Sequence, residues 1–266
     1  MSKHRWRWAA LLGTLALLLT LTLNRAQRTA PPLTPSSPIG AVVDRMVGSI
    51  DYYDAIDAEI VNQWFGDDTP RTATTRVVAR MRPDPGARAE FTAPDGRRIT
   101  EIFDGDQLMR VDQTEGAFRT YPVAKQTMRD QIGDLAARFD PRNWGTAARA
   151  VRRTDGPVSL GATQMLHPQD YALGLIGQGQ TTIDGQTEIL GRTVLQITVV
   201  LPGRGDFDQA RFWIDAQTGI VLKRQSFKGQ RLYEEEVITR LTYTPDIDAD
   251  AFRADPPAGY HQWPRP

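Results

Sequence analysis

Four consecutive β-strands are predicted between Arg192 and Tyr243, and they constrain the fold of the chain more than any other feature. Each run is short and rich in β-branched and aromatic residues, and glycine-bearing turns lie between the runs, which is the pattern of antiparallel hairpins. The predicted strands are Val194–Leu201, Ala210–Asp215, Ile220–Phe227 and Leu232–Tyr243. In the first of them apolar residues occupy both alternating faces, so parts of both faces of the sheet are expected to be covered.

A second run of strands precedes this meander. Arg76 and Arg80 alternate with Val77 and Ala79, so one face is expected to be apolar and the other rich in arginine. The turns between the strands carry the Asp, Pro and Gly residues that tight hairpins require. The predicted strands are Ala58–Trp64, Thr74–Met81, Ala87–Thr92, Arg98–Phe103, Gln107–Asp112 and Ala117–Tyr121, and Thr181–Leu190 follows later in the chain.

Two regions have helical patterns instead. Ser37 and Pro38 suit an N-cap and a first helical position, and they open a predicted helix from Pro38 to about Asp54 whose apolar face packs on the sheet. Residues 123–179 interrupt the two runs of strands and are predicted to be a helical insertion. Its predicted helices are one marked by Met128, Ile132, Leu135 and Phe139, a second from Trp144 to Arg153 and a third from Pro168 to Ile176.

The predicted fold is therefore mainly β (α+β): an antiparallel sheet of about eleven strands with an N-terminal helix and a helical insertion. Neighbouring strands are rotated by roughly 20°, so a sheet of this size curls strongly. Full closure would fill the interior with side chains, whereas incomplete closure leaves an apolar trough. The pattern alone does not say which face is concave.

The amino terminus has the features of a membrane signal. Lys3, Arg5 and Arg7 precede an apolar run from Trp8 to Leu23, which places the amino terminus in the cytoplasm and the rest of the chain outside it. The run is shorter than the roughly 20 residues of a full span, and no clean cleavage site follows it. Residues 1–28 are therefore predicted to be an uncleaved signal-anchor, with a removed signal peptide as the alternative. Residues 29–37 form a Pro/Ser/Thr-rich tether, and residues 38–266 form the folded domain.

Composition excludes several classes of function. The chain has no cysteine, three scattered histidines and a net charge of zero, which gives no basis for a disulfide, a zinc site or nucleic-acid binding. Turn chemistry explains Asp104 and Asp106, and no nucleophile–base pair is evident, so neither a metal site nor catalysis is predicted. The run Glu234-Glu235-Glu236 is expected to be a solvated strand end.

Several motifs, in order, resemble the LolA/LolB-like lipoprotein-carrier superfamily, which includes the RseB/MucB-like N-terminal domain of sigma-factor regulators. The resemblance covers most of the chain from Pro38 to Tyr260. The motifs are Met81-Arg82-Pro83, Glu90-Phe91, Ile102-Phe103-Asp104-Gly105, Gly191-Arg192 through Leu201-Pro202, Phe212-Trp213-Ile214-Asp215, Thr218-Gly219, and Phe252 with Pro256-Pro257-Ala258-Gly259.

The resemblance implies an unclosed half-barrel, covered by a helical lid, whose apolar cavity holds the acyl chains of a lipid or lipoprotein. It implies no cofactor, and it makes Arg82 a lid contact. The domain is then expected outside a bacterial cell membrane, anchored by a single pass or, after cleavage, periplasmic or secreted. The predicted cavity residues are Val78, Phe91, Ile102, Met109, Phe118, Leu195, Ile197 and Val199.

Two departures from the family and several alternatives stay open. The predicted anchor does not suit a freely diffusing carrier, and the helical insertion is long for a lid. The apolar residues could also form an ordinary packed core, and Trp64 and Phe65 are either a hydrophobic lip or part of that core. The function expected is a non-catalytic carrier, and the alternative is a regulator that senses lipid and controls a membrane-bound anti-sigma partner.

Overall fold

The computed structural model describes residues 31–66, 69–81, 84–122, 164–203 and 207–263. The chain divides into two compact units, Met1–Pro32 and Leu33–Pro266, and the second contains nearly all of the described residues. The predicted membrane segment, residues 1–28, lies outside the described part. Among the described residues no helix is long and apolar enough to cross a membrane.

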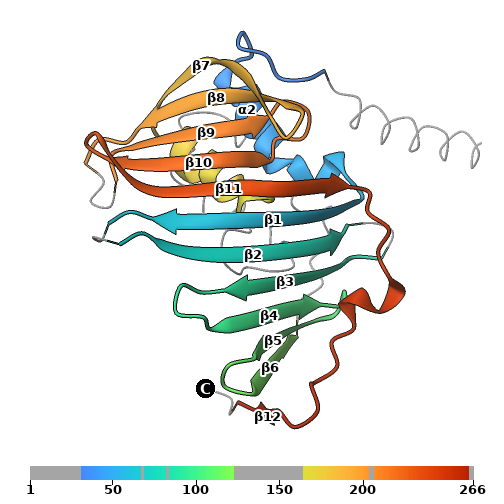
Figure 1. Cartoon of the computed structure of the whole chain (residues 1–266). Helices are drawn as coiled ribbons and strands as arrows, with labels where there is room; N and C mark the ends of the chain where they lie inside the picture. Colours follow the sequence, from blue (N-terminus) through green and yellow to red (C-terminus); the bar gives the residue numbers. More distant parts are fainter. Residues whose placement is uncertain (1–30, 67–68, 82–83, 123–163, 204–206, 264–266) are drawn as a thin grey trace, which may run out of the picture. The chain divides into compact units, whose positions relative to one another are not determined.

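Leu33–Pro266 is built on one 12-stranded sheet that does not close, because β12 and β7 lie at its two ends (Figure 1). The spatial order is β12-β6-β5-β4-β3-β2-β1-β11-β10-β9-β8-β7, and every neighbouring pair is antiparallel except β12 with β6. The predicted mainly β, unclosed architecture is confirmed, with one short strand more than expected. The strands are β1 (Ala55–Trp64), β2 (Arg71–Arg80), β3 (Gly86–Thr92), β4 (Arg98–Phe103), β5 (Gln107–Asp112), β6 (Ala117–Pro122), β7 (Gln180–Ile189), β8 (Arg192–Val200), β9 (Gln209–Asp215), β10 (Val221–Lys228), β11 (Arg231–Tyr243) and β12 (His261–Gln262).

The pairing of β1 with β11 joins the two runs of strands into one sheet. Ile60 lies opposite Ile238 and Asn62 lies opposite Glu236, with a register shift between Glu59 and Ile60. The residues in these two pairs are more than 170 positions apart in the chain, so no local sequence pattern predicts the pairing. This seam decides which side chains of the two halves meet.

A short helical segment covers one face of the sheet. Helix α2 (Ile39–Val47) buries Val42, Val43, Met46 and Val47, and Gly48 ends it. A 3₁₀-helix, η1 (Ser49–Tyr52), continues the segment, so the single helix predicted to run to Asp54 is in fact two elements.

The predicted N-cap of α2 is wrong in detail. Pro38 is the N-cap, and no side chain caps the helix. The Ser37 hydroxyl instead accepts a hydrogen bond from the Thr34 backbone N–H (2.9 Å), which shapes the turn before the helix.

Gly219, with φ of +80°, lies so close to α2 that a Cβ there would be 2.3 Å from the Arg45 carbonyl oxygen.

The described end of the insertion packs beside α2. Helix α6 (Gln169–Tyr171) runs directly into a π-helical turn, η4 (Ala172–Ile176), which confirms the third predicted helix. Tyr171, Leu175 and Ile176 are buried in the same apolar core as α2. The other two predicted helices lie within residues 123–163, outside the described part of the chain.

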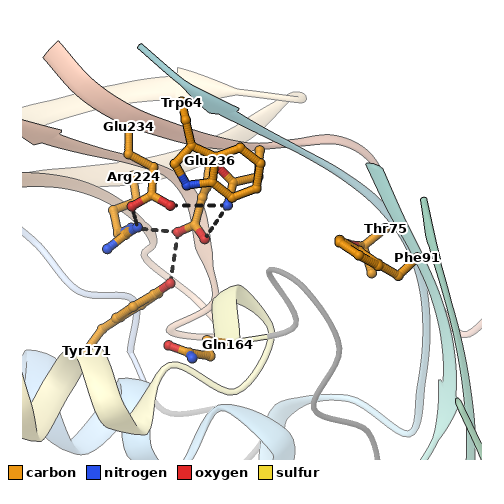
Figure 2. A pocket seen from close by; sticks show the side chains of 9 residues that line it. Trp64, Thr75, Phe91, Gln164, Tyr171, Arg224, Glu234 and Glu236 are labelled. Atoms are coloured by element: carbon orange, nitrogen blue, oxygen red, sulfur yellow. Dashed lines mark hydrogen bonds and ion pairs between the residues drawn. The ribbon is translucent and has the colours of Figure 1, made fainter. Parts of the chain in front are cut away.

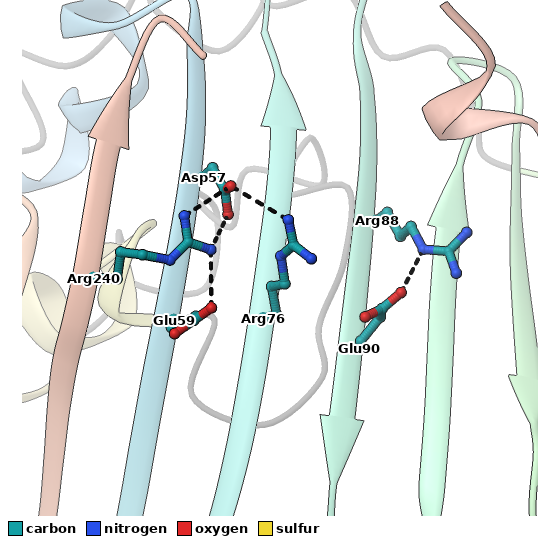
Figure 3. Close-up of polar contacts among 6 residues, drawn as sticks. All are labelled: Asp57, Glu59, Arg76, Arg88, Glu90 and Arg240. Atoms are coloured by element: carbon teal, nitrogen blue, oxygen red, sulfur yellow. Dashed lines mark hydrogen bonds and ion pairs between the residues drawn. The ribbon is translucent and has the colours of Figure 1, made fainter. Parts of the chain in front are cut away.

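We call the face of the sheet that α2, α6 and η4 cover the inner face, and the opposite one the outer face. Alternation along β1 places Ile56, Ala58 and Ile60 in the core on the inner face. On the outer face, Arg240 binds Asp57 and Glu59 of β1, and Arg76 and the Arg88–Glu90 pair continue the charged row across β2 and β3 (Figure 3). The arginine-rich face predicted from β2 and β3 is therefore this outer face.

The carboxy-terminal segment covers part of the sheet on the outer side. After β11 the chain forms a short 3₁₀-helix, η5 (Ala249–Phe252), and then continues to β12 (Figure 1). Phe252 packs on Gly86, where a Cβ would be 2.4 Å from its ring. Farther on, Ala254 and Tyr260 pack against a small second core of Ile102, Met109 and Val111.

Candidate functional site

A cavity of about 370 Å³ lies on the inner face, where the two halves of the sheet meet under α6. Its walls come from both sides of the β1–β11 seam: β1, β2 and β3 on one side, β10 and β11 on the other, and α6 above. Figure 2 shows the polar side chains gathered at one end and Thr75 with Phe91 at the other. The lining residues are Asn62, Trp64, Thr75, Phe91, Gln164, Tyr171, Arg224, Glu234 and Glu236.

Strand alternation explains how the polar end is assembled. Glu234 and Glu236 are two residues apart on β11, so their side chains share the inner face. Arg224 lies opposite Glu236 on β10, and Asn62 lies opposite it on β1. Tyr171 reaches the same carboxylate from α6. We call Asn62, Tyr171, Arg224, Glu234 and Glu236 the polar cluster.

Hydrogen bonds connect every member of the polar cluster (Figure 2). The Arg224 guanidinium donates to Glu236 Oε2 (2.5 Å) and binds Glu234, and the Tyr171 hydroxyl donates to Glu236 Oε2 (2.8 Å). Asn62 Nδ2 donates to Glu234 Oε1 (3.2 Å) and to Glu236 Oε1 (3.4 Å). The Arg224 guanidinium also lies 5.0 Å from the centre of the Tyr171 ring.

Burial dominates the electrostatics of the cluster. The side chains of Arg224 and Glu236 are only 8% and 5% exposed. Burial raises the pKa of Glu236 above its usual range, and Arg224 opposes that rise. Burial, followed by the negative charge of Glu236, raises the pKa of the Tyr171 hydroxyl well above 10. Tyr171 therefore acts as a hydrogen-bond donor at neutral pH.

The bonding of the cluster suits positioning and recognition more than reaction. All four carboxylate oxygens accept at least one hydrogen bond from within the cluster. The two carboxylates are thus tied to Arg224, Tyr171 and Asn62 rather than directed at a substrate as free bases. Among the described residues no group of three or more acidic or histidine side chains could hold a metal ion.

Four of the predicted cavity residues lie on the inner face. Phe91 lines the cavity. Leu195, Ile197 and Val199 are fully buried in the main core, where the far half of the sheet packs against the helices. They belong to the same face as the cavity but do not line it.

The other four predicted cavity residues lie on the outer face. Val78 is opposite Asp57 in the sheet register and so points to the charged outer side. Ile102 is opposite Arg88, and Met109 is opposite Ile102. Ile102 and Met109 belong to the small core that the carboxy-terminal segment covers, and Phe118 packs against that core. Arg82, the predicted lid contact, lies outside the described residues.

The polar cluster was not predicted from the sequence, and it shows that the expectation for the glutamate run on β11 is wrong. The run Glu234-Glu235-Glu236 is not a solvated strand end, because Glu236 is 4% exposed and pairs with a buried arginine. Arginine at 224 and alternating glutamates on the next strand were the available signal, since antiparallel neighbours place opposite charges side by side. Trp64, one of the two residues read as lip or core, lines the cavity.

Comparison with known proteins finds similarity only at the level of structure. No protein-family model and no curated protein sequence matches the chain. A solved structure of an uncharacterized conserved protein from Thermus thermophilus matches 85% of this chain and 98% of its own (TM-score 0.47, 9% identity). MucB in the Pseudomonas aeruginosa MucA/MucB complex matches 82% of this chain (TM-score 0.46, 16% identity), and this chain spans 62% of it.

LprF from Mycobacterium bovis matches 83% of this chain and 100% of its own (TM-score 0.40, 12% identity). A LolA superfamily protein and a putative outer membrane lipoprotein-sorting protein domain are also among the matches. At these identities and TM-scores the similarity is one of chain arrangement, and it assigns no ligand to this cavity.

Proposed function

We propose that Leu33–Pro266 binds an amphiphile, namely a lipid or a lipoprotein, and holds its acyl chain in the inner-face cavity. The observation that carries the proposal is the division of the cavity into a polar end and an end formed by Thr75 and Phe91, and Trp64 also lines it. A ligand with one polar and one apolar end fits such a division. The volume of about 370 Å³ is at the small end of the range for ligand sites, which suits one chain segment rather than a whole lipid.

Small side chains on β2 lie beside the cavity. Ala73 and Thr75 share the inner face, opposite Asn62 and Ile60 of β1, and do not reach far from the backbone. An acyl chain gains about 0.8 kcal/mol for each CH₂ that it buries. Several methylene groups placed over Phe91 would therefore bind with useful affinity.

We infer a role in binding or transfer at the outer side of a bacterial membrane, without catalysis. The predicted signal in residues 1–28 supports the location, and the fully hydrogen-bonded carboxylates support the absence of a reaction. A regulator that binds a membrane protein is the other outcome to test, because the sequence motifs also resemble the RseB/MucB-like domain of sigma-factor regulators.

Photolabelling tests the proposal on the full-length chain reconstituted in lipid vesicles. An alkyl probe with a diazirine on its chain should label peptides of β1 and β3, which carry Trp64 and Phe91. Peptide mapping by mass spectrometry reads the sites. Labelling that stays on the bilayer lipid and the N-terminal segment would reject a ligand cavity, and co-purification of a stoichiometric protein without lipid would favour the regulator.

A matched pair of variants makes the assay specific. Thr75 is buried and lines the cavity, whereas its neighbour Thr74 is exposed on the outer face. Thr75→Phe should fill the cavity and reduce labelling of β1 and β3 about tenfold or more, while Thr74→Phe should leave it unchanged. Equal labelling of the two variants, both with an intact fold by circular dichroism, would contradict the proposal.

A further inference from the structure

The turn between β7 and β8 holds a leucine in an unfavourable backbone conformation. Ile189 and Arg192 form the last pair of the two strands. The loop between them is therefore two residues long, and both residues have a positive φ, +53° for Leu190 and +68° for Gly191. Such turns favour asparagine, aspartate or glycine at the first position, because other side chains crowd the backbone in this conformation. The fold therefore keeps Leu190 at a cost in stability.

Leu190 lacks the compensation that a second residue of this kind has. Among the described residues, Thr244 is the other non-glycine residue with a positive φ. Its backbone N–H donates to the Ala55 carbonyl (3.0 Å), and its hydroxyl donates to the Tyr243 carbonyl (2.7 Å). The Leu190 side chain has no polar group, and at 46% Leu190 is the most exposed large apolar residue in the described part of the chain. A strained residue without such compensation is a candidate for a role in function.

Leu190 lies at the end of the sheet where the chain enters the folded unit. Just after the turn, the Thr193 carbonyl accepts a hydrogen bond from the Ala216 backbone N–H (3.0 Å). The Ala216 carbonyl in turn accepts one from the Leu33 backbone N–H (2.9 Å), and Leu33 is buried. Leu33, the first residue of the unit, is thus fixed at the same end of the sheet as Leu190.

The predicted membrane segment brings a bilayer within reach of this end. Nine residues, 24–32, separate the end of the apolar run at Leu23 from Leu33. A connection of this length spans at most about 35 Å when fully extended. The turn at Lys228 and Gly229 lies at the other end of β10 (Figure 1), and the 8 residues of that strand are about 26 Å long. Of the two ends of the sheet, the one with Leu190 is therefore nearer to the point of attachment.

We propose that the β7–β8 turn contacts the surface of the bilayer and that the Leu190 side chain inserts into it. Thr187, Glu188 and Thr193 are exposed and polar, so Leu190 is the one large apolar side chain exposed among the described residues of this tip. A stable protein interface buries roughly 800 Å² on each partner, which one side chain does not supply. One apolar side chain on a polar tip suits shallow insertion, which removes it from water.

The attachment of the chain makes such a weak contact sufficient. Insertion of one side chain does not have to bring the protein to the membrane, because the predicted anchor already holds it there at a high effective concentration. The contact instead sets which end of the sheet faces the lipid. The inference goes beyond the proposed function and does not depend on what the cavity holds.

A fluorescent label on an introduced cysteine tests the contact, because the chain has no cysteine of its own. Thr187→Cys places the label beside the turn and leaves Leu190 in place. Gln230→Cys is the matched control, since Gln230 is exposed in the β10–β11 turn at the opposite end. Each full-length chain is reconstituted in phosphatidylcholine nanodiscs that contain a lipid with a nitroxide on its head group. Quenching at position 187 should exceed quenching at position 230 by about twofold or more, because the two ends lie about 26 Å apart.

Replacing the leucine tests whether its side chain makes the contact. Leu190→Asn and Leu190→Gly both suit the turn and are expected to fold, which circular dichroism checks. Each should remove at least about half of the difference in quenching between positions 187 and 230, because the apolar contact is lost.

Three results would overturn the inference. The first is equal quenching at the two positions, and the second is quenching at position 187 that both replacements of Leu190 leave unchanged. The third is a label at position 187 that is shielded from aqueous iodide but not quenched by the nitroxide lipid. That result would show that a protein, such as a second copy of this chain, covers the turn instead of a bilayer.

Discussion

The buried arginine of the polar cluster provides a direct test of how the two halves of the sheet are held together. Replacing Arg224 with Met keeps an unbranched side chain but removes the guanidinium that lies over the Tyr171 ring and whose charge Glu234 and Glu236 share. Both carboxylates then stay in a site where the side chain of Glu236 is 5% exposed. We expect this variant to be strongly destabilised.

The magnitude follows from two opposing terms. At about 4 Å and an effective dielectric constant of about 20, each carboxylate gains about 4 kcal/mol from the guanidinium. Removing the guanidinium also removes its own desolvation cost, which is several kcal/mol. The net loss expected for Arg224→Met is therefore about 3–5 kcal/mol, a large part of the 5–15 kcal/mol that holds a typical domain folded.

The outer face offers a matched control. Arg240 also bridges two carboxylates, Asp57 and Glu59, but its side chain is 40% exposed (Figure 3). When Arg240 is removed, Glu59 is open to water and Asp57 keeps Arg76 as a partner, so Arg240→Met should cost at most about 1 kcal/mol. The comparison separates burial from the simple count of ion pairs.

Urea titration read by pulse proteolysis on the full-length chain measures both variants. In Arg224→Met the folded state should bind more protons than the unfolded state, because burial then raises the carboxyl pKa without opposition. Its stability should accordingly rise as the pH falls from 7 towards 4.5, the unfolded value for Glu236. Adding Glu236→Gln should recover about 2 kcal/mol by removing the more buried charge. Equal losses in Arg224→Met and Arg240→Met, or no recovery in the double variant, would refute the reasoning.

Two further predictions concern the hairpins. Asp112 accepts hydrogen bonds from Arg97 and from two backbone N–H groups. Burial raises the pKa of Asp112, but these hydrogen bonds outweigh burial and bring the pKa below its usual 3.8. Asp112→Asn should cost about 1.5–3 kcal/mol at pH 7, and the difference from the wild-type chain should shrink as the pH falls below 3.8; a constant difference down to pH 2.5 would contradict it. Leu190 is exposed with φ of +53° in the β7–β8 turn, so Leu190→Asn should raise the urea midpoint by an amount equivalent to about 1 kcal/mol, and a lowered midpoint would show that its side chain is needed.

The strands could be predicted from the sequence because strand signals are local. Alternation and turn residues in the sequence predicted β1 to β11 within a few residues, and they identified the arginine-rich face of β2 and β3. The predicted third helix in the insertion is present as α6 and η4 for the same reason. These features depend on residues two to four positions apart, which a single sequence displays directly.

The choice of face in β4 to β6 shows where local patterns fail. Ile99 and Ile102 lie on opposite faces of β4, and both are buried. The main core covers one, and the carboxy-terminal segment near Ala254 and Tyr260 covers the other. A strand with apolar residues on both faces gives no preference, so Ile102, Met109 and Phe118 were expected in a cavity that they do not line.

The sequence by itself determined the order and nature of the elements, because hydrogen-bonded turns and side-chain alternation act over a few residues. Only the tertiary structure decided where the site lies. It placed β11 beside β1 and brought Tyr171 over both, so that Asn62, Arg224 and Glu236 share one buried position. Moving a charged side chain from water into the core costs free energy. Whether such a side chain lies in water or in the core depends on partners far away in the chain.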